Sequence, residues 1–585
     1  MSRAKAPRAK AAVAPVAVSS WRFYLVAFAL AALLVLLAGR VLSLQVMDVQ
    51  YGRDFLQNQG AKRALRTAEL PAYRGVITDR RGEPLAVSTP VVSIWANPRE
   101  LRESDRLPEL AKALGWSEVA LQERLTKYAN KQFMYLKRHQ EPPAARVVLA
   151  EKFAGVYGER EYQRFYPAGE VAAQVVGFTD VDGVGIDGVE FAYNSWLEGT
   201  PGRKQYLKDL HGEMVRDIGV LEPVQPGKDL ALSIDLRLQT LQHRELQRAV
   251  TSLGAKSGSA VTLDSRTGEV LAMVNYPVYN PNKRRGVKAN SMRNRAITDV
   301  YEPGSIVKAL TLVAALESGK YSPNTIIDTS PGTIRVESKV YLDPSDYGKM
   351  SLAGVLQKSS QVGITKIALD LGHEPIWGVF NRFGIGEPPG TGFPGESAGK
   401  LPNRARWHMT EKMSLAFGYG ITASALQLAS AYSVFASGGV RQPISMVSLE
   451  GELPAGEQII SVRTAAQMLD MLHSVTEEGG TANKARIAGY EVGGKTGTVH
   501  KVGGGKYLHD KYVALFAGIA PIENPRIVTV VVIDEPKGDS YGGGAAAAPV
   551  FSAITQGALR ILNIAPTRFE ESEDVLLAQV DGGLQ

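Results

Sequence analysis

Ser305 and Lys308 are the residues of this 585-residue chain whose types and spacing point most directly to chemistry. They lie in the segment YEPGSIVK, where Pro303 and Gly304 mark a turn and the following residues predict an apolar helix that ends before Gly319. Residues three apart share one face of a helix, so the hydroxyl and the amine face the same way. The start of a helix also offers N–H groups to developing negative charge. A lysine whose pKa is lowered by burial can be the base that makes the serine nucleophilic.

The Ser-x-x-Lys spacing is weak evidence by itself, because it also arises by chance as an exposed helical pair. Two downstream segments strengthen the catalytic interpretation. The segment KTGT at 495–498 follows two glycines, and it offers a cation and two hydroxyls to a ligand that approaches the backbone closely. The segment SSQ at 359–361 lies between the other two, with Ser359 placed 54 residues after Ser305 and 136 residues before Lys495. Three motifs in this order are far more specific than any one of them.

Together the three motifs resemble the S-x-x-K, S-D-N and K-T-G set of the penicillin-recognising serine enzymes. The chain is more narrowly similar to the class B penicillin-binding proteins, and most like their division-specific septal type. The segment RGVITDRRGEPLA at 74–86 resembles one pedestal signature of that family, and GIDGVE at 185–190, followed by LEG at 197–199, resembles another. The resemblance covers residues 20–560.

The resemblance implies a mixed α+β fold. It consists of a penicillin-recognising transpeptidase domain, with a five-stranded antiparallel sheet and helices on both faces, on an elongated N-terminal pedestal with one transmembrane helix. Apolar runs that begin near positions 258, 268, 493, 512 and 526 predict the five strands. The long insertion between the second and third runs holds Ser305, Ser359 and the predicted helix TASALQLASAYSVFAS. Thr422 is the expected N-cap of that helix, and Gly438 lies just past its end.

The N-terminus predicts a retained membrane anchor. Phe23–Gly39 is uncharged and apolar, and VLSLQV beyond Arg40 extends it to spanning length. The first 22 residues carry five basic residues and no acid precedes Asp48, so the tail is expected in the cytoplasm and residues from about 44 onward outside. The basic tail disfavours a buried soluble helix, and a cleaved signal peptide is disfavoured because no Ala-x-Ala-like site follows the run. We therefore expect a single-pass protein of the bacterial inner membrane with a periplasmic catalytic domain.

The domain organisation follows from these features. Residues 44–225 contain no convincing catalytic cluster, so they predict a pedestal with a dimerisation-like or partner-docking role, and QPGK at 225–228 predicts a linker. The predicted divisions are a cytoplasmic basic tail at 1–22, a transmembrane anchor at 23–43, the pedestal at 44–225, the transpeptidase domain at 226–565 and an acidic tail at 566–585.

Composition argues against several other chemistries. The chain has no cysteine, which excludes thiol catalysis, disulfides and cysteine-ligated zinc. Its eight histidines include no His-x-x-x-His pair, so no metal and no cofactor are expected, and His500 and His509 are interpreted as surface or site-rim residues. No basic-aromatic cluster predicts a nucleic-acid partner. Residues 489–496 match the phosphate-loop pattern, but glycines at 503–505 follow where such a loop requires a helix.

The resemblance also implies a mechanism, the cross-linking of peptidoglycan. Ser305 would attack the carbonyl between two terminal D-alanines of a stem peptide, with Lys308 as the base. Ser359 and Lys495 would relay the proton to the departing D-alanine, and backbone N–H groups of Ser305 and Thr498 would form the oxyanion hole. An amine from a neighbouring stem would then resolve the acyl-enzyme. The implied substrate-binding residues are Gln361, Thr496, Gly497, Thr498 and Tyr541.

Gln361 departs from the family pattern, which is Ser-x-Asn. The extra methylene moves the amide by roughly an ångström, and misplacement on that scale can cost about 100-fold in rate where alignment matters. Three alternatives stay open: an elongation-type class B transpeptidase, another serine hydrolase of the same fold, and a non-catalytic penicillin-binding scaffold or sensor, whose only support is Gln361. The expected partners are peptidoglycan stem peptides, β-lactam antibiotics, the inner membrane, a glycosyltransferase and other division proteins.

Overall fold

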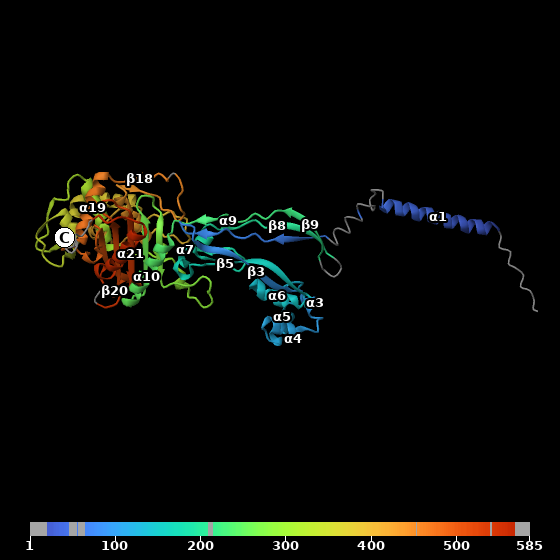
Figure 1. The fold of residues 1–585 in the computed structure, drawn as a ribbon. Helices are drawn as coiled ribbons and strands as arrows, with labels where there is room; N and C mark the ends of the chain where they lie inside the picture. Colours follow the sequence, from blue (N-terminus) through green and yellow to red (C-terminus); the bar gives the residue numbers. More distant parts are fainter. Residues whose placement is uncertain are drawn as a thin grey trace, which may run out of the picture. The chain divides into compact units, whose positions relative to one another are not determined.

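The computed structural model describes residues 20–45, 55, 65–208, 214–451, 453–538 and 541–567. Most of the predicted basic tail, most of the acidic C-terminal tail and Ser540 lie outside these residues. Contacts within the chain divide it into two units, Met1–Pro71 with Pro201–Gln225, and Ala72–Thr200 with Pro226–Gln585 (Figure 1).

The first unit contains a long apolar helix and a small sheet. Helix α1 (Ser20–Gln45) has a mean hydropathy of 2.6 over its most apolar stretch, and its 26 residues are enough to cross a bilayer by length and composition. The predicted anchor at 23–43 lies within it. Strands β1 (Leu65–Leu70), β8 (Gly202–Lys208) and β9 (Met214–Glu222) form an antiparallel sheet in the order β1-β8-β9.

The second unit begins with the pedestal residues. Their sheet has the order β10-β2-β3-β4, with β5 paired to β3. The strands are β2 (Ile77–Thr78), β3 (Pro84–Ala96), β4 (Met134–Gln140), β5 (Val156–Phe165) and β10 (Leu230–Ala231). Shorter elements follow β5: α7 (Ala173–Val176), β6 (Phe178–Thr179), β7 (Gly185–Asp187), α8 (Gly188–Ala192) and α9 (Asn194–Leu197).

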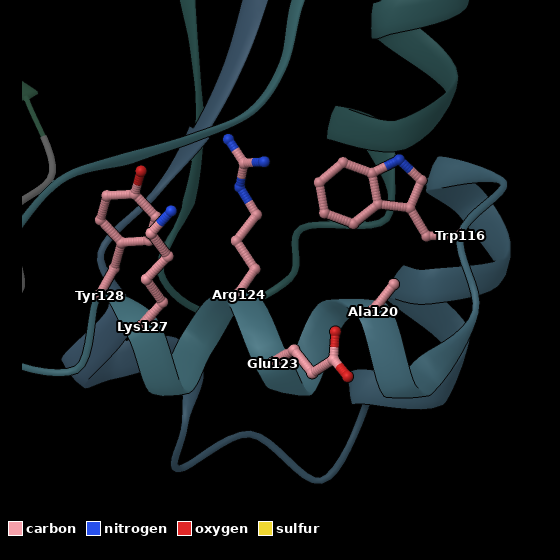
Figure 2. Close-up of a pocket in the computed structure, with 6 residues that line it drawn as sticks. All are labelled: Trp116, Ala120, Glu123, Arg124, Lys127 and Tyr128. Atoms are coloured by element: carbon pink, nitrogen blue, oxygen red, sulfur yellow. The ribbon is translucent and has the colours of Figure 1, made fainter.

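Four helices of the pedestal pack around a small core of their own, to which Leu110 and Leu121 belong. They are α3 (Pro98–Leu101), α4 (Leu107–Leu114), α5 (Glu118–Lys127) and α6 (Pro142–Ala150). On the outside of α5, Trp116 and Tyr128 lie on either side of Arg124 and line an open cavity of about 430 Å³ (Figure 2). No predicted site residue lines this cavity.

A buried ion network joins the two pedestal signatures. Arg74 Nε donates to Glu190 Oε2 at 2.5 Å, and Arg164 Nε donates to Glu190 Oε1 at 2.6 Å. The Glu190 side chain is 0% exposed and the arginines are 8% and 3% exposed. Arg74 also donates to the Asn194 side chain at 2.8 Å. The two segments, more than a hundred residues apart in sequence, are thus held together by a buried carboxylate and the guanidinium groups that compensate its charge.

The larger sheet of this unit carries the KTGT motif. Its order is β12-β11-β21-β20-β19, and each pair is antiparallel. The strands are β11 (Ser257–Asp264), β12 (Val270–Tyr276), β19 (Gly493–Gly503), β20 (Lys506–Ala520) and β21 (Ile527–Asp534). All residues of the central β21 are buried, because helices cover both faces of the sheet.

Two groups of helices provide that cover. Helices α10 (Leu236–Ser252) and α21 (Ala548–Ile561) pack against each other and on the sheet, and α18 (Ala425–Ala436) packs on β11, β20 and β21 and against α19 (Val462–Thr476). The five strands and the helical insertion between β12 and β19 agree with the predicted fold. The other helices of the insertion are α11 (Ala289–Met292), α12 (Arg295–Thr298), α13 (Lys308–Glu317), α14 (Leu352–Gln357), α15 (Gln361–Leu371), α16 (His373–Arg382) and α17 (Met409–Ala416).

One local prediction was wrong. The N-cap of α18 is Ser424, whose hydroxyl accepts from Gln427 N while the Gln427 side chain accepts from Ser424 N; Thr422 instead forms a β-bridge with Lys400. The predicted linker at 225–228 stays a prediction. The two units divide inside it, between Gln225 and Pro226, and Gly227 N donates to Tyr73 O at 3.0 Å while Lys228 N donates to Trp196 O at 3.1 Å. The difference in the N-cap comes from the contact between Thr422 and Lys400, which local sequence does not show.

Replacing Glu190 by glutamine should destabilise the pedestal strongly. The substitution leaves two buried guanidinium groups without their carboxylate, and breaking a buried ion pair in this way costs about 3–5 kcal/mol. Urea unfolding of the purified protein, followed by tryptophan fluorescence, measures the change. The exposed Glu198→Gln is the matched control and should change stability by less than about 0.5 kcal/mol. Equal stability of the two variants would contradict the structural role assigned to the network.

Candidate active site

Ser305 lies in a 3-10 turn, η2 (Gly304–Val307), that leads directly into α13. The sequence predicted one continuous helix from Ser305 with an apolar stripe, but the first turn is 3-10 and α13 is buried on every side up to Leu316. Gly304 has φ +54°, and a Cβ there would lie 2.4 Å from Val499 Cγ1. Only glycine therefore lets the turn that carries Ser305 approach β19.

Lys308 is buried beneath this turn, with a side chain that points at the middle motif. Its Nζ donates to Ser359 O at 2.7 Å and to Ser359 Oγ at 3.2 Å, and it lies 5.8 Å from the centre of the Phe417 ring. Among the described residues, the Ser305 hydroxyl has no hydrogen-bond partner. Catalytic hydrogen bonds are often completed only when a substrate is bound, so this arrangement is compatible with a Lys308 base.

Ser359 adopts a conformation that is unusual for its residue type. Its φ is +56°, in the left-handed region, which costs a non-glycine residue on the order of 1–3 kcal/mol. The residue follows the end of α14, where Ser359 N donates to Leu356 O at 3.1 Å. The turn directs both its carbonyl and its hydroxyl toward Lys308 Nζ. Strain held by surrounding contacts in this way is typical of functional sites.

Lys495 reaches the same hydroxyl from the sheet. Its Nζ donates to Ser359 Oγ at 3.0 Å and to Thr496 O at 3.2 Å, and its side chain is fully buried. It is carried by β19, which pairs with β20 along one edge and ends the strand order of the sheet on the other. The structure therefore brings together Lys308, Ser359 and Lys495 from the three motifs, around one oxygen atom.

The two ammonium groups strongly affect each other. Burial lowers the pKa of Lys308 to about 7, against an opposing effect of the Asp343 carboxylate. Burial, and then the positive charge of Lys308, hold the pKa of Lys495 well below its ordinary value. Two like charges around one buried hydroxyl are unfavourable, so at neutral pH one of the amines is readily neutral. A neutral amine beside a proton-bearing one is what a proton relay requires.

Asp343 fixes the backbone of the middle motif, and sequence reasoning missed it. Its Oδ2 accepts from Ser360 Oγ at 2.5 Å, and its Oδ1 accepts from the backbone N–H groups of Gln361 at 2.5 Å and Val362 at 3.2 Å. Ser360 in turn caps α15, since its Oγ accepts from Gly363 N at 2.8 Å. Asp343 is thus a positioning residue for the motif. Its only signal in the sequence was a carboxylate between two short strands, which carries no pattern.

The Gln361 side chain is exposed at the first position of α15. Among the described residues it has no side-chain hydrogen-bond partner. The backbone of the residue, by contrast, is fixed by Asp343. The longer amide is therefore able to adjust to a ligand without disturbing the motif that carries it.

The remaining predicted binding residues lie along β19 and the loop before α20 (Gly543–Ala546). Thr498 is exposed, and its Oγ1 accepts from Gly543 N at 2.9 Å. Thr496 Oγ1 lies 3.2 Å from Thr481 Oγ1. Gly497 lies between Thr496 and Thr498 in the strand. Tyr541 is 41% exposed and stacks on Tyr512 with ring centroids 4.3 Å apart.

Tyr512 and the two histidines extend this aromatic stack. The His500 ring lies 4.7 Å from Tyr512 and 5.9 Å from His509. Tyr512 was missed because it lies on β20, inside an apolar run whose pattern predicts only a strand.

The phosphate-loop pattern at 489–496 leads into β19, a strand, whereas such a loop needs a helix. Within the described residues, no group of three or more His, Cys, Asp or Glu side chains is placed to hold a metal ion.

Two family models match most of the chain. Residues 258–556 match the penicillin binding protein transpeptidase domain, and residues 69–232 match the penicillin-binding protein dimerisation domain. The first match includes all three motifs and Tyr541. The second covers most of the predicted pedestal.

Relatives and solved structures agree with these matches. The chain is 42% identical over 554 residues to the peptidoglycan D,D-transpeptidase FtsI of Escherichia coli K12, covering 94% of this chain and 93% of the relative. It is 41% identical to the probable peptidoglycan D,D-transpeptidase PbpC of Pseudomonas aeruginosa, covering 96% and 99%. Penicillin-binding protein 3 of Mycobacterium tuberculosis, complexed with aztreonam, is similar with a TM-score of 0.66 and 28% identity, covering 86% and 98%. The transpeptidase domain of Burkholderia pseudomallei penicillin-binding protein 3 is similar with a TM-score of 0.54 and 40% identity, covering 58% and 98%.

The lowered pKa of Lys308 predicts how the reaction with a β-lactam depends on pH. A base must be neutral to accept a proton, so the acylation rate should rise with pH, about tenfold per unit below pH 7, and level off above it. Because burial is the largest cause of the shift, Lys308→Arg, whose guanidinium stays protonated, should abolish the rise along with most of the rate. Stopped-flow measurement of benzylpenicillin acylation between pH 5.5 and 9 tests this. A rate that is flat from pH 5.5 to 7 would contradict a Lys308 base.

Gln361 should be tolerated but suboptimal. Since its side chain is exposed and unpartnered among the described residues, Gln361→Asn should acylate as fast as the parent or up to about 100-fold faster, the scale of misalignment effects. Gln361→Ala should be clearly slower than both, because a substrate amide then loses its partner. The second-order acylation rates of the three proteins with one β-lactam decide this. An asparagine variant much slower than the parent would show that the site is built around glutamine.

Proposed function

The chain belongs to the class B penicillin-binding proteins, and from that premise we propose that it is a septal peptidoglycan D,D-transpeptidase acting through an acyl-enzyme on Ser305. The observation that carries the proposal is the convergence of Lys308 and Lys495 on the hydroxyl of Ser359, directly behind the turn that holds Ser305. A buried pair of amines with lowered pKa, linked by a hydroxyl, supplies both a base and a proton donor.

In the first half-reaction, Ser305 Oγ attacks the carbonyl carbon between the two terminal D-alanines of a stem peptide. Its proton passes to neutral Lys308. The carbonyl oxygen becomes negative and is held by the backbone N–H groups of Ser305 and Thr498, an interaction worth about 3–4 kcal/mol in comparable sites. The C–N bond then breaks, and Lys495 and Ser359 relay a proton to the departing D-alanine.

Substrate recognition is assigned to β19 and its surroundings. The stem peptide adds as a further strand along the outer edge of β19, and Gln361 reaches its amide from α15. Thr496 and Thr498 hydroxyls, with Lys495 near them, hold the terminal carboxylate. Gly497, which is also assigned to this site, lets the strand lie close to the Ser305 turn, since a Cβ there would lie 2.9 Å from Pro303 O. Tyr541 contacts the substrate from the facing loop.

In the second half-reaction, an amine from a neighbouring stem attacks the ester and restores the Ser305 hydroxyl. Because the ester conserves the energy of the broken peptide bond, no nucleotide is needed.

The proposed domains are an anchor at 23–43, a pedestal at 44–225 and the transpeptidase domain at 226–565. The orientation with the basic tail inside and the active site in the periplasm rests on the charges that flank α1. A glycosyltransferase that extends the glycan strand, together with other division proteins, is the proposed partner set.

A non-catalytic β-lactam sensor is the second candidate, and Gln361 is the observation that favours it. A sensor acylates but does not transfer the acyl group to an amine. An elongation-type enzyme would share the chemistry and differ only in its place in the cell.

Intact-protein mass spectrometry after treatment with benzylpenicillin tests the proposal. One adduct should form on the peptide that contains Ser305, and Ser305→Ala should abolish it, because loss of a catalytic nucleophile costs many orders of magnitude. Ser318→Ala, just beyond the end of α13, is the control and should label like the parent. An adduct in the Ser305→Ala variant would refute the mechanism. Turnover of an ester substrate with an added amine acceptor separates a transpeptidase from a sensor.

A further inference from the structure

Glu302 lies three residues before Ser305 and is tied to two elements beside the nucleophile. Its Oε1 accepts from Gly420 N at 2.8 Å and from the Tyr507 hydroxyl at 3.2 Å, and its Oε2 accepts from the same hydroxyl at 3.1 Å. Tyr507 belongs to β20, next to the hairpin that follows the KTGT strand. Neither the motifs nor the proposed mechanism uses this carboxylate.

The turn that carries Ser305 is packed tightly on the loop that Glu302 contacts. Gly304 N donates to Gly418 O at 3.2 Å. A Cβ on Gly418, which has φ +81°, would lie 2.4 Å from Gly304 O. This close approach fixes Glu302, Ser305 and the 418–420 loop relative to one another.

A cavity of about 600 Å³ lies next to that loop. Tyr419, Gly420 and Tyr507 line it, and the two tyrosine rings meet edge to face with centroids 6.4 Å apart. Burial, and then the charge of Glu302, raise the pKa of Tyr507 to about 12. The phenol is therefore neutral at physiological pH and donates its proton to a charged Glu302 carboxylate.

The other acidic groups here are already engaged, whereas Glu302 keeps capacity for a ligand. Asp343 uses both oxygens to hold the middle motif, and Glu411, which lines the cavity, is paired with Arg404. The hydrogen bonds to Glu302 come from neutral donors, so its negative charge is not compensated by a cation among the described residues. A carboxylate has about four acceptor sites, and three contacts occupy Glu302.

From this arrangement we infer that Glu302, flanked by Tyr419 and Tyr507, is a subsite for the primary ammonium group of a peptidoglycan stem peptide. The inference rests on the proposed function, which requires an amine on the acceptor stem. Every stem that is not yet cross-linked carries that amine, so the bound group belongs either to the acceptor or to the donor. A carboxylate with aromatic rings beside it suits an alkylammonium chain, whose head needs a charged acceptor and whose methylenes need apolar contact.

For an acceptor, the subsite would hold the amine next to the acyl-enzyme. The ammonium gives one proton to solvent, and its nitrogen attacks the ester carbonyl carbon. The bond from that carbon to Ser305 Oγ breaks as the amide bond forms. The second proton passes by way of Lys308 to Ser305 Oγ, which restores the hydroxyl. For a donor, the same contact would align the stem before acylation.

Glu302→Gln tests the inference, because the amide oxygen still accepts from Gly420 N while the charge is lost. Four rates are compared in the full-length protein: acylation by a D-Ala-D-lactate ester donor with a free side-chain amine, acylation by the same donor with that amine acetylated, and transfer of the acyl group to glycinamide or to methanol. An acceptor subsite predicts that transfer to glycinamide falls at least about tenfold while transfer to methanol changes much less. A donor subsite predicts that acylation by the free-amine donor falls by a similar factor relative to the acetylated donor.

Two further variants complete the test. Tyr507→Phe keeps the charge but removes the hydroxyl that orients it, so it should show the same selective loss at a smaller size. Glu317→Gln, at the far end of α13 and paired with Arg382, should leave all four rates within twofold of the parent. If Glu302→Gln lowers charged and neutral partners equally, or none of them, the subsite is refuted. Loss of all acylation in the parent protein would instead refute the proposed function.

Discussion

The hydroxyl of Ser359, shared by two buried lysines, is the constraint on which the rest of the site depends. Within the part of the chain that the structure describes, neither Lys308 nor Lys495 has a buried carboxylate partner, so each is tolerated through hydrogen bonds and a lowered pKa. To place one oxygen between them, the chain holds Ser359 in a left-handed conformation at the end of α14. Asp343 and Ser360 then fix the next residues, so that the strain is balanced by caps and hydrogen bonds.

The surrounding fold supplies the rigidity that this geometry requires. Helix α13 carries Lys308 and is buried from Lys308 to Leu316, and β19 carries Lys495 at the edge of a sheet whose central strand is wholly buried. Sites on packed helices and strands hold their groups within small tolerances, whereas loops do not. The pedestal contains a second buried charged cluster, the Arg74–Glu190–Arg164 network. Its groups must lie close together to compensate each other's charge, and they have no assigned role in catalysis. The lysine–serine cluster and the ion network have different roles. In both, removing one partner leaves another buried polar or charged group without its stabilising contact.

Much of this could be predicted from the sequence, and the omissions have a common cause. The motifs gave Ser305, Lys308, Ser359 and Lys495 in register, and apolar runs predicted the five strands and the long apolar helix α1. What could not be predicted depends on contacts between distant segments. Asp343 has no sequence pattern around it. Ser424 and not Thr422 caps α18, because Thr422 forms a β-bridge with Lys400. Tyr512 is part of an aromatic stack only because the loop with Tyr541 folds over it. The 3-10 turn at Ser305 likewise follows from packing against β19, not from local propensity.

The position of β19 at the edge of the sheet bears on which peptides can pair with it. The unpaired N–H and C=O groups of an edge strand can form hydrogen bonds with any extended chain, and proteins usually protect such edges. Here the turn at Gly304 packs on the strand at Val499, and the register shifts between His500 and Lys501, so the regular pairing surface is limited to the neighbourhood of the KTGT segment. In the proposed binding mode, a peptide that pairs there runs past Thr496 and Thr498 and ends beside buried cations, an end that suits a free carboxylate better than a continuing chain. If the proposed binding mode holds, this short edge would select an extended peptide that ends in a carboxylate before any chemistry at Ser305 begins.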